Sequence, residues 1–339
     1  MTVDKRLRFP SSRVSLTNGQ VIDELLAQGK RIHGFWGTAP TGKPHIGYLV
    51  PLIKIAEMVA AGIEFSIYFA DEYAYLLNYK DPRHLVAHRT EYYEHLIRAI
   101  LQALGTPLKG DSPKRKPVEF VRESDLFASI EKSSDDLNRL YTSLSLDDVR
   151  SVSEEMETAT MFSTLLCPAR QSGVFALAER ILPHLGYRGR AHLTTDMIPG
   201  LTTAKMSSSH EADTKVELLD TPDVVHSKIE DATCIPGVVE GNALLAIAKH
   251  ILLPLSSLRM AMDGESYRFN VCVEGKDRTY SNYEDLQHDF LTQCFAPGEL
   301  KVSVATGLNR ILDPIRKDYE SNEAWRKVEL LAYTESSST

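Results

Sequence analysis

The sequence contains few cysteines and no long apolar run. Its 339 residues include 4 cysteines, which are widely spaced and form no CxxC pair. This spacing indicates a reducing compartment and argues against a disulfide scaffold or a structural zinc site. No apolar stretch is long enough to cross a bilayer, and the N-terminal segment lacks the apolar core of a signal peptide. We therefore expect a cytoplasmic protein with no membrane contact and no bound metal.

An excess of basic charge is also absent. Lys and Arg number 38 against 46 Asp and Glu, which gives a formal net charge of −8. This balance argues against a protein that coats nucleic acid without specificity, although local basic patches can still hold phosphates. The hydrophobic share of 43% and the charged share of 25% are those of an ordinary globular protein, and the length suggests two domains.

Apolar segments of strand length alternate with longer segments of helical periodicity in the N-terminal half. We predict buried strands and amphipathic helices there, the first helix closing on Gly62 as a C-cap. This alternation predicts an α/β fold with a doubly wound parallel sheet. Beyond residue 220 the pattern is helical, with Thr221 and Pro222 as a helix start. The predicted strands are 31–38, 63–70 and 117–123; the helices are 49–62, 82–104, 174–185, 222–232, 241–255, 282–295 and 298–318.

The first chemical motif is Pro44-His45-Ile46-Gly47, which follows a strand and opens a helix. A helix N-terminus carries free N–H groups and partial positive charge, so it attracts phosphates. A histidine at this point can donate to a phosphate oxygen, and Gly47 leaves room for a flat ring against the backbone. A surface histidine after a proline is the alternative interpretation, and it is equally compatible with this motif alone.

The second motif is Lys205-Met206-Ser207-Ser208-Ser209. Its lysine is a mobile point charge suited to pyrophosphate, and its serines add donors on a polar loop. A serine-rich linker would be favoured if the loop stood alone. The two motifs in this order indicate a nucleotide-binding site more specifically than either motif alone, because together they supply its two halves.

With both motifs, the chain resembles class I aminoacyl-tRNA synthetases, whose signatures are named HIGH and KMSKS. The segments FWGTAPTGKPHIGYLVPLIKIAEMVAAG, FADEYAYLLN and HLTTDMIPGLTTAKMSSS are similar to the tyrosyl-tRNA synthetases of eukaryotes and archaea. The resemblance implies a Rossmann-like catalytic domain over 1–214, shortened around 142–173. It also implies a smaller all-α anticodon-binding domain over 215–325, and we expect a disordered tail over 326–339.

The resemblance also implies the chemistry and the partners. The substrates would be tyrosine, ATP with Mg²⁺ bound through the nucleotide, and tRNA(Tyr), and the chain would form a homodimer through helices inserted in the catalytic domain. The implied site residues fall into three groups: the catalytic residues His45, Gly47, Lys205, Ser207 and Ser208; the ATP-binding residues Gly37, Thr38, Thr41, Gly42, Pro44, Met206 and Ser209; and the tyrosine-binding residues Phe35, Asp71, Cys167 and Gln171. For Asp71, capping of the next turn is an equal alternative.

Three departures from the family pattern concern the tyrosine pocket. Phe35 and Cys167 stand where the family has tyrosines, so a hydroxyl that helps to recognise the substrate phenol is missing. After Gln171 the chain passes at once into Ser172-Gly173 and a helix, whereas the family first continues with an aspartate, a buried strand and a second glutamine. The segment 142–166 also matches the family poorly.

The absence of a central strand would leave backbone N–H and C=O groups of the neighbouring strands without hydrogen-bond partners. Each such buried group lowers the stability of the fold by about 1–3 kcal/mol. Either another segment fills the gap, or the sheet splits, or the sequence is a spliced or mis-joined form of a longer enzyme. Three functions therefore stay open: a tyrosine–tRNA ligase, an impaired isoform or paralogue that keeps ATP or tRNA binding, and another nucleotidyl-transfer enzyme of the same superfamily. The helical C-terminal region argues against the third.

Overall fold

The structure is a computed structural model, and it divides the chain into two compact units. The first unit comprises 1–40, 58–90 and 109–196, and the second comprises 41–57, 91–108 and 197–339. Within these units the structure describes residues 14–77, 82–108, 118–129, 166–168, 172–181, 183, 186, 188–201, 214–255, 258 and 268–333.

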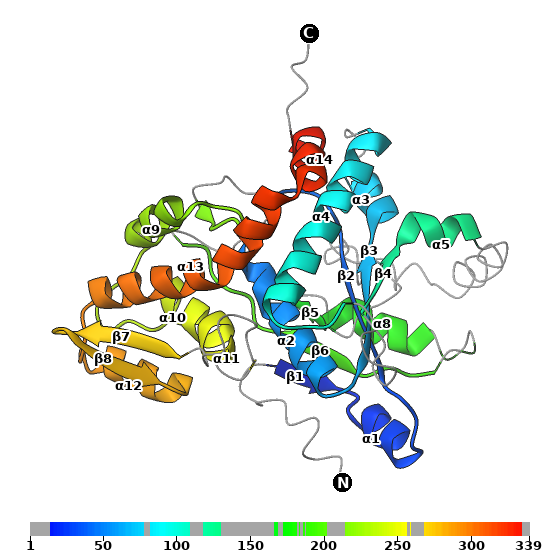
Figure 1. Ribbon diagram of the computed structural model, residues 1–339. Coiled ribbons are helices and arrows are strands. Elements are labelled where there is room, and N and C mark those ends of the chain that lie inside the picture. The colour runs from blue at the N-terminus through cyan, green and yellow to red at the C-terminus, as the bar shows by residue number, and fades with distance from the viewer. Residues whose placement is uncertain are drawn as a thin grey trace. The chain divides into compact units, whose positions relative to one another are not determined.

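A parallel three-stranded sheet forms the centre of the first unit. Its strands are β2 (His33–Thr38), β3 (Glu64–Phe69) and β4 (Glu119–Arg122), in the order β2-β3-β4 (Figure 1). The middle strand is buried along most of its length, as a strand covered on both faces must be. All three strands coincide with predicted ones. Short helices, α3 (Asp71–Leu77) and α5 (Glu123–Ser129), begin directly after β3 and β4.

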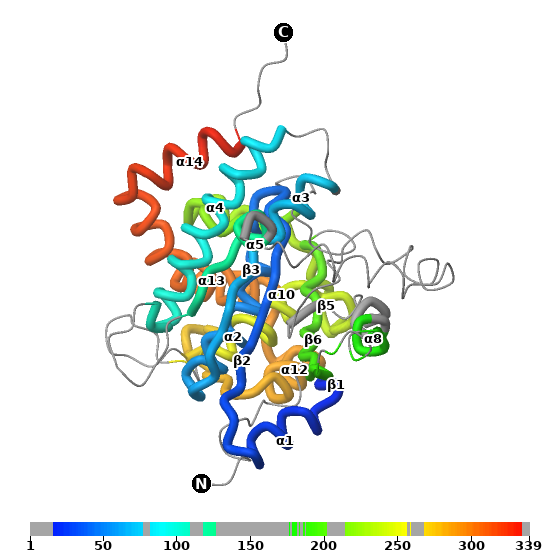
Figure 2. Tube along the Cα trace, turned by 90° about the vertical axis from the view of Figure 1, so that its right-hand side faces the viewer, coloured from blue at the N-terminus to red at the C-terminus, as the bar shows by residue number. Residues whose placement is uncertain are grey.

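A second three-stranded sheet in the same unit has the order β1-β6-β5. In it β1 (Val14–Thr17) runs antiparallel to β6 (His192–Thr195), and β5 (Leu166–Pro168) runs parallel to β6. The helix α1 (Gln20–Ala27) follows β1, and α8 (Ser172–Ile181) follows β5. Figure 2 shows β1, β5 and β6 grouped beside β2 and β3.

The position of β5 is relevant to the central strand that the sequence was expected to lack. The strand β5 lies next to β2, yet among the described residues no hydrogen-bonded ladder joins the two. Among the described residues the strands therefore form two separate sheets, as the alternative of a split sheet predicts. The strand β5 precedes Gln171, so it does not test whether another segment fills the gap predicted after Gln171.

The second unit is mostly helical. Its longest described helix, α13 (Pro297–Ser321), places six apolar residues on one buried face, all 0% exposed. This face packs against α9 (Pro222–Asp231), α14 (Glu323–Tyr333) and the strand β7 (Phe269–Val273). The helices are α9 (Pro222–Asp231), α10 (Ala243–Ile247), a π turn (Ala248–Leu252), α11 (Leu253–Leu255), α12 (Tyr283–Leu291), α13 (Pro297–Ser321) and α14 (Glu323–Tyr333). The predicted helices of this region are confirmed, and so is the cap of α9, where Thr221 Oγ1 accepts from Val224 N at 3.4 Å.

Two features of the second unit differ from the sequence expectation. A hairpin of β7 (Phe269–Val273) and β8 (Lys276–Tyr280) lies within the region predicted to be all-α, and Glu274 and Gly275 turn it with positive φ. The prediction of a disordered tail is wrong for residues 326–333, because α14 continues to Tyr333. Trp325, Val328 and Ala332 are buried on that helix, and this packing outweighs its polar composition.

The helices α2 (Leu49–Ala60) and α4 (Arg83–Ala103) contribute residues to both units. Both coincide with predicted helices, and Gly62 ends α2 with φ 93°, as predicted. The predicted boundary after residue 214 does not coincide with the division into units. The physical reason is that segment 41–57 and α4, through Tyr92 and His95, make contacts with the C-terminal helices. The catalytic and anticodon-binding roles of the two regions stay predictions. No helix in the described part of the chain is both long and apolar enough to cross a membrane.

Candidate functional site

His45 starts a short 3-10 turn, η2 (Ile46–Tyr48), that leads into α2. Its backbone is extended, and its Nδ1 accepts a hydrogen bond from Gly47 N at 3.1 Å. A neutral imidazole that accepts at Nδ1 carries its proton on Nε2. The ring is 8% exposed and therefore held in place. The turn thus presents an oriented N–H donor at a helix start, which is what stabilisation of a phosphate oxygen requires.

Gly47 is required by this histidine. A Cβ at position 47 would lie 2.6 Å from His45 Cε1 and 2.8 Å from Nδ1, too close for any real contact. From the sequence, the absence of a side chain at Gly47 was expected to leave space for a flat ring. The structure gives a nearer reason, since the imidazole itself occupies the space that a side chain would need.

The turn is paired with the segment that follows the serine-rich loop. His45 and Glu217 form an antiparallel β-bridge, Ile46 N donates to Val216 O at 3.0 Å, and Leu218 N donates to Pro44 O at 3.4 Å. Residues 202–213 lie outside the described residues, so the structure describes no predicted residue of the Lys205 loop. The segment 216–218, which follows this loop in the sequence, is fixed to the turn by backbone hydrogen bonds.

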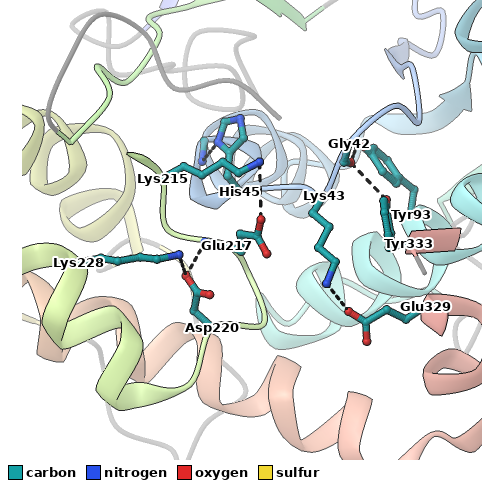
Figure 3. Close-up of polar contacts among 11 residues, drawn as sticks. Gly42, Lys43, His45, Tyr93, Lys215, Glu217, Asp220, Lys228, Glu329 and Tyr333 are labelled. Carbon is teal, nitrogen blue, oxygen red and sulfur yellow. Dashed lines mark hydrogen bonds and ion pairs between the residues drawn. The ribbon is translucent and has the colours of Figure 1, made fainter. Parts of the chain in front are cut away.

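Lys215 and Glu217 were missed by the sequence argument. Lys215 precedes Glu217 by two residues in the segment that pairs with the turn, and its Nζ is 3.6 Å from Glu217 Oε1. Lys215 is 2% exposed, and burial lowers the pKa of its ammonium. Figure 3 shows both side chains beside His45. The alternation of polar and apolar residues over 215–218 was the available signal, because it is typical of a short strand.

The residues just before His45 contact α14. Lys43 Nζ is 2.8 Å from Glu329 Oε1, and the ammonium lies 5.5 Å from the centre of the Tyr333 ring. The Gly42 carbonyl accepts from two tyrosine hydroxyls, Tyr93 at 2.6 Å and Tyr333 at 3.2 Å (Figure 3). Lys43, Glu217 and Glu329 also line a cavity of about 200 Å³ in this unit.

In the first unit, polar side chains gather where β3 and β4 end. Asp71 accepts at Oδ1 from Glu72 N (3.1 Å) and Ser124 N (2.9 Å), and at Oδ2 from Ser124 Oγ (2.6 Å). This carboxylate therefore caps the starts of both α3 and α5, which favours the capping alternative. Its role as a tyrosine ligand stays a prediction.

Phe35 on β2 is half-buried, with its ring centre 5.2 Å from that of Tyr68 on β3. The Tyr68 hydroxyl is hydrogen-bonded to Glu123, a 6% exposed carboxylate that also accepts from Tyr73 N at 2.9 Å. Burial raises the pKa of Glu123, and it also raises the pKa of Tyr68. A buried phenol, itself hydrogen-bonded to a buried carboxylate, therefore lies beside Phe35, and neither group was predicted from the sequence.

The other predicted site residues are placed as follows. Gly37 is half-buried on β2, and Thr38 at its end is buried, with its carbonyl accepting from Ala70 N at 2.9 Å. Thr41 is half-buried in the segment before the turn, and Pro44 is buried. Cys167 pairs with Thr194 through the backbone of β5. Lys205, Met206, Ser207, Ser208, Ser209 and Gln171 lie outside the described residues.

A family model described as "tRNA synthetases class I (W and Y)" matches residues 27–166 and 171–313. The chain belongs to this family. Within it, the chain is 39% identical to the cytoplasmic tyrosine–tRNA ligase of Gallus gallus, over 89% of this chain and 58% of the relative. It is 31% identical to the cytoplasmic enzyme of Saccharomyces cerevisiae, over 93% of this chain and 84% of that one. These matches place the chain with the tyrosine–tRNA ligases of the family.

A solved structure of tyrosyl-tRNA synthetase from Archaeoglobus fulgidus, complexed with L-tyrosine, has a TM-score of 0.76 and 25% identity, and covers 94% of this chain and 99% of that one. The synthetase fold is thereby confirmed. The chain spans less than two thirds of the length of its first matched relatives. The family match is interrupted between 166 and 171, next to the point where the sequence lacks the family's strand.

Proposed function

We propose that the protein is a tyrosine–tRNA ligase. A carboxylate oxygen of tyrosine attacks the α-phosphorus of ATP, and pyrophosphate leaves to give tyrosyl-adenylate. A hydroxyl at the 3′ end of tRNA(Tyr) then attacks the tyrosyl carbonyl, and AMP leaves. The family membership and the tyrosine–tRNA ligase relatives support the substrates. Mg²⁺ enters with ATP, as part of the substrate.

One observation carries the proposal: the bridge between His45 and Glu217. It attaches the segment that follows the Lys205 loop in the sequence to the turn that presents an oriented histidine N–H donor. In the proposed mechanism His45 stabilises charge on the α-phosphate. Lys205 neutralises the departing pyrophosphate, while Ser207 and Ser208 donate to it. No side chain forms a covalent bond, so catalysis consists of positioning and charge stabilisation.

The other parts of the proposal concern the surroundings of the reaction. The C-terminal helical region would hold the anticodon part of tRNA(Tyr), and two copies of the chain would form a homodimer. The names of the matched relatives support a cytoplasmic location. Sedimentation measurements test the dimer, and filter binding with tRNA(Tyr) against another tRNA tests the partner.

Tyrosine-dependent exchange of pyrophosphate into ATP tests the central claim. Exchange with tyrosine and with no other amino acid supports the ligase, whereas ATP or tRNA binding without exchange would support the impaired form. Exchange that depends on a substrate other than an amino acid would overturn both.

We expect Lys205→Ala to reduce the exchange rate by about 100-fold with little change in tyrosine affinity, because the lysine acts on the pyrophosphate. Lys276→Ala is the matched control, since Lys276 is exposed on the hairpin. An unchanged exchange rate in Lys205→Ala would refute the role of the lysine.

A further inference from the structure

We infer that Glu329, on the C-terminal helix α14, is a positioning residue for residues 42–48, which are called the histidine turn below, and that it thereby sets the affinity for ATP. The inference rests on the proposed function, in which the histidine turn binds the phosphates of ATP. Glu329 lies 286 residues from Lys43 in sequence, and its carboxylate pairs with the Lys43 ammonium and accepts a hydrogen bond from the Tyr319 hydroxyl. Its link to the turn is the ion pair with Lys43.

The contacts of α14 fall on two consecutive residues of the turn. Glu329 pairs with the ammonium of Lys43, and the Tyr333 hydroxyl donates to the carbonyl of Gly42. Tyr93 donates to the same carbonyl from α4. The Gly42 carbonyl thus accepts two hydrogen bonds, and the neighbouring Lys43 ammonium is paired with a carboxylate. These contacts leave the backbone at Gly42 and Lys43 few alternative conformations.

The Glu329 carboxylate is held from two sides. Oε1 faces Lys43, and Oε2 accepts a hydrogen bond from the Tyr319 hydroxyl on α13. Burial, and then the contact with Glu329, raises the pKa of Tyr319 to about 12, so this phenol is a donor at neutral pH. The carboxylate side chain is 18% exposed. An ion pair that is partly buried and has a second hydrogen bond is worth more than an ordinary surface pair.

The base of α14 is fixed, so the position of Glu329 follows from packing. Trp325 is 0% exposed and lies in ring contact with Tyr92, His95 and Tyr319, at centre distances of 6.2, 5.8 and 5.3 Å. Asn322 Oδ1 accepts from Trp325 N at 3.1 Å and caps the helix start. Glu329 lies one turn beyond this anchored segment.

The turn is thus held from two sides. The strand segment 216–218 pairs with Pro44 and Ile46, and α14 holds Gly42 and Lys43. In Figure 3 the Lys43 side chain extends toward Glu329 and away from His45. Loss of the Glu329 charge would release the first half of the turn while the bridge to Glu217 remains. The predicted consequence is weaker ATP binding with little effect on tyrosine.

Glu329→Gln tests this inference by two independent measurements. Hydrogen exchange followed by mass spectrometry should show faster exchange in peptides covering 42–48. In the pyrophosphate exchange assay, KM for ATP should rise about 5-fold to 10-fold, as expected for the loss of one charge-assisted hydrogen bond. KM for tyrosine and kcat should stay within about 2-fold.

Glu323→Gln is the matched control, because Glu323 is an exposed glutamate on the same helix. Tyr333→Phe removes a single hydroxyl and should act in the same direction more weakly, which keeps the test valid if Glu329→Gln is poorly folded. The charge swap Lys43→Glu with Glu329→Lys should restore slow hydrogen exchange, whereas each single change should not.

The outcomes separate the inference from the proposed function. If the wild-type protein shows tyrosine-dependent exchange, and Glu329→Gln changes neither the hydrogen exchange of 42–48 nor KM for ATP, the inference is overturned and the function stands. Faster hydrogen exchange without a change in KM for ATP also overturns it. If the wild-type protein shows no tyrosine-dependent exchange, the proposed function fails. Calorimetric titration with MgATP then decides the inference, which requires weaker binding by the variant.

Discussion

The replacement Gly47→Ala puts a methyl group into the space that the His45 ring occupies. The new carbon would lie 2.6 Å from His45 Cε1 and 2.8 Å from Nδ1, so the imidazole must move away. The movement breaks the 3.1 Å hydrogen bond between Gly47 N and Nδ1. Overpacking of this kind lowers the free energy of unfolding by about 1–3 kcal/mol. A displaced catalytic group lowers the rate by about 100-fold.

Thermal denaturation and pyrophosphate exchange together measure these two effects. We expect a melting temperature several degrees below that of the wild type, since each kcal/mol shifts it by roughly 2–4 °C in a domain of moderate size. Gly298→Ala is the control: Gly298 is an exposed helical glycine with open space around it, and this change should leave exchange unaffected.

The double variant His45→Ala, Gly47→Ala makes the test specific. Without the imidazole the methyl group meets no obstacle, so the melting temperature should recover relative to Gly47→Ala, while exchange stays low. A Gly47→Ala protein with the melting temperature and exchange rate of the wild type would refute the reasoning. Equal stability of the single and double variants would show that the histidine ring is not the obstacle.

Three further changes test other parts of the structure. Burial raises the pKa of Glu123 above its ordinary value of 4.5, so the folded wild-type protein loses stability as this carboxyl ionises. The Glu123→Gln variant cannot ionise there, and its stability relative to the wild type should therefore increase as the pH rises above 4.5. Melting curves at several pH values measure this difference. Trp325→Ala should lower the free energy of unfolding by about 3–5 kcal/mol in denaturant titration, since the indole is 0% exposed. Phe35→Tyr should increase the preference for tyrosine over phenylalanine in pyrophosphate exchange; an unchanged ratio would contradict its place in the pocket.

Long, strongly periodic elements were predictable from the sequence. The strands β2 and β3 and the helices α2, α4 and α13 have enough apolar residues at one spacing to fix their type. Among the elements of three to five residues, β4 was predicted but β7 and β8 were not, because so few residues carry little periodicity. The strand β8 is exposed at four of its five positions, so its hydrophobic pattern gives no strand signal. The length of β5 and the split beside β2 depend on which distant segments pair.

The candidate site follows the same rule. The histidine turn was predictable because strand, turn and helix start are local features. The pairing of His45 with Glu217 and of Lys43 with Glu329 was not, since residues so distant in sequence meet only through the tertiary fold. Asp71 shows the limit for a single residue: its sequence context suits a ligand or a cap equally, and only the positions of Glu72 and Ser124 show that it caps two helices.

The attachment of the turn to α14 also sets an order of events during synthesis. Residues 42–48 leave the ribosome before Glu217, and Glu217 leaves it before Glu329 and Tyr333. The nascent chain therefore carries the turn without its partners until these residues have emerged. Full nucleotide affinity would arise only after α14 has emerged, so chains terminated before α14 would compete poorly for ATP with chains that contain it.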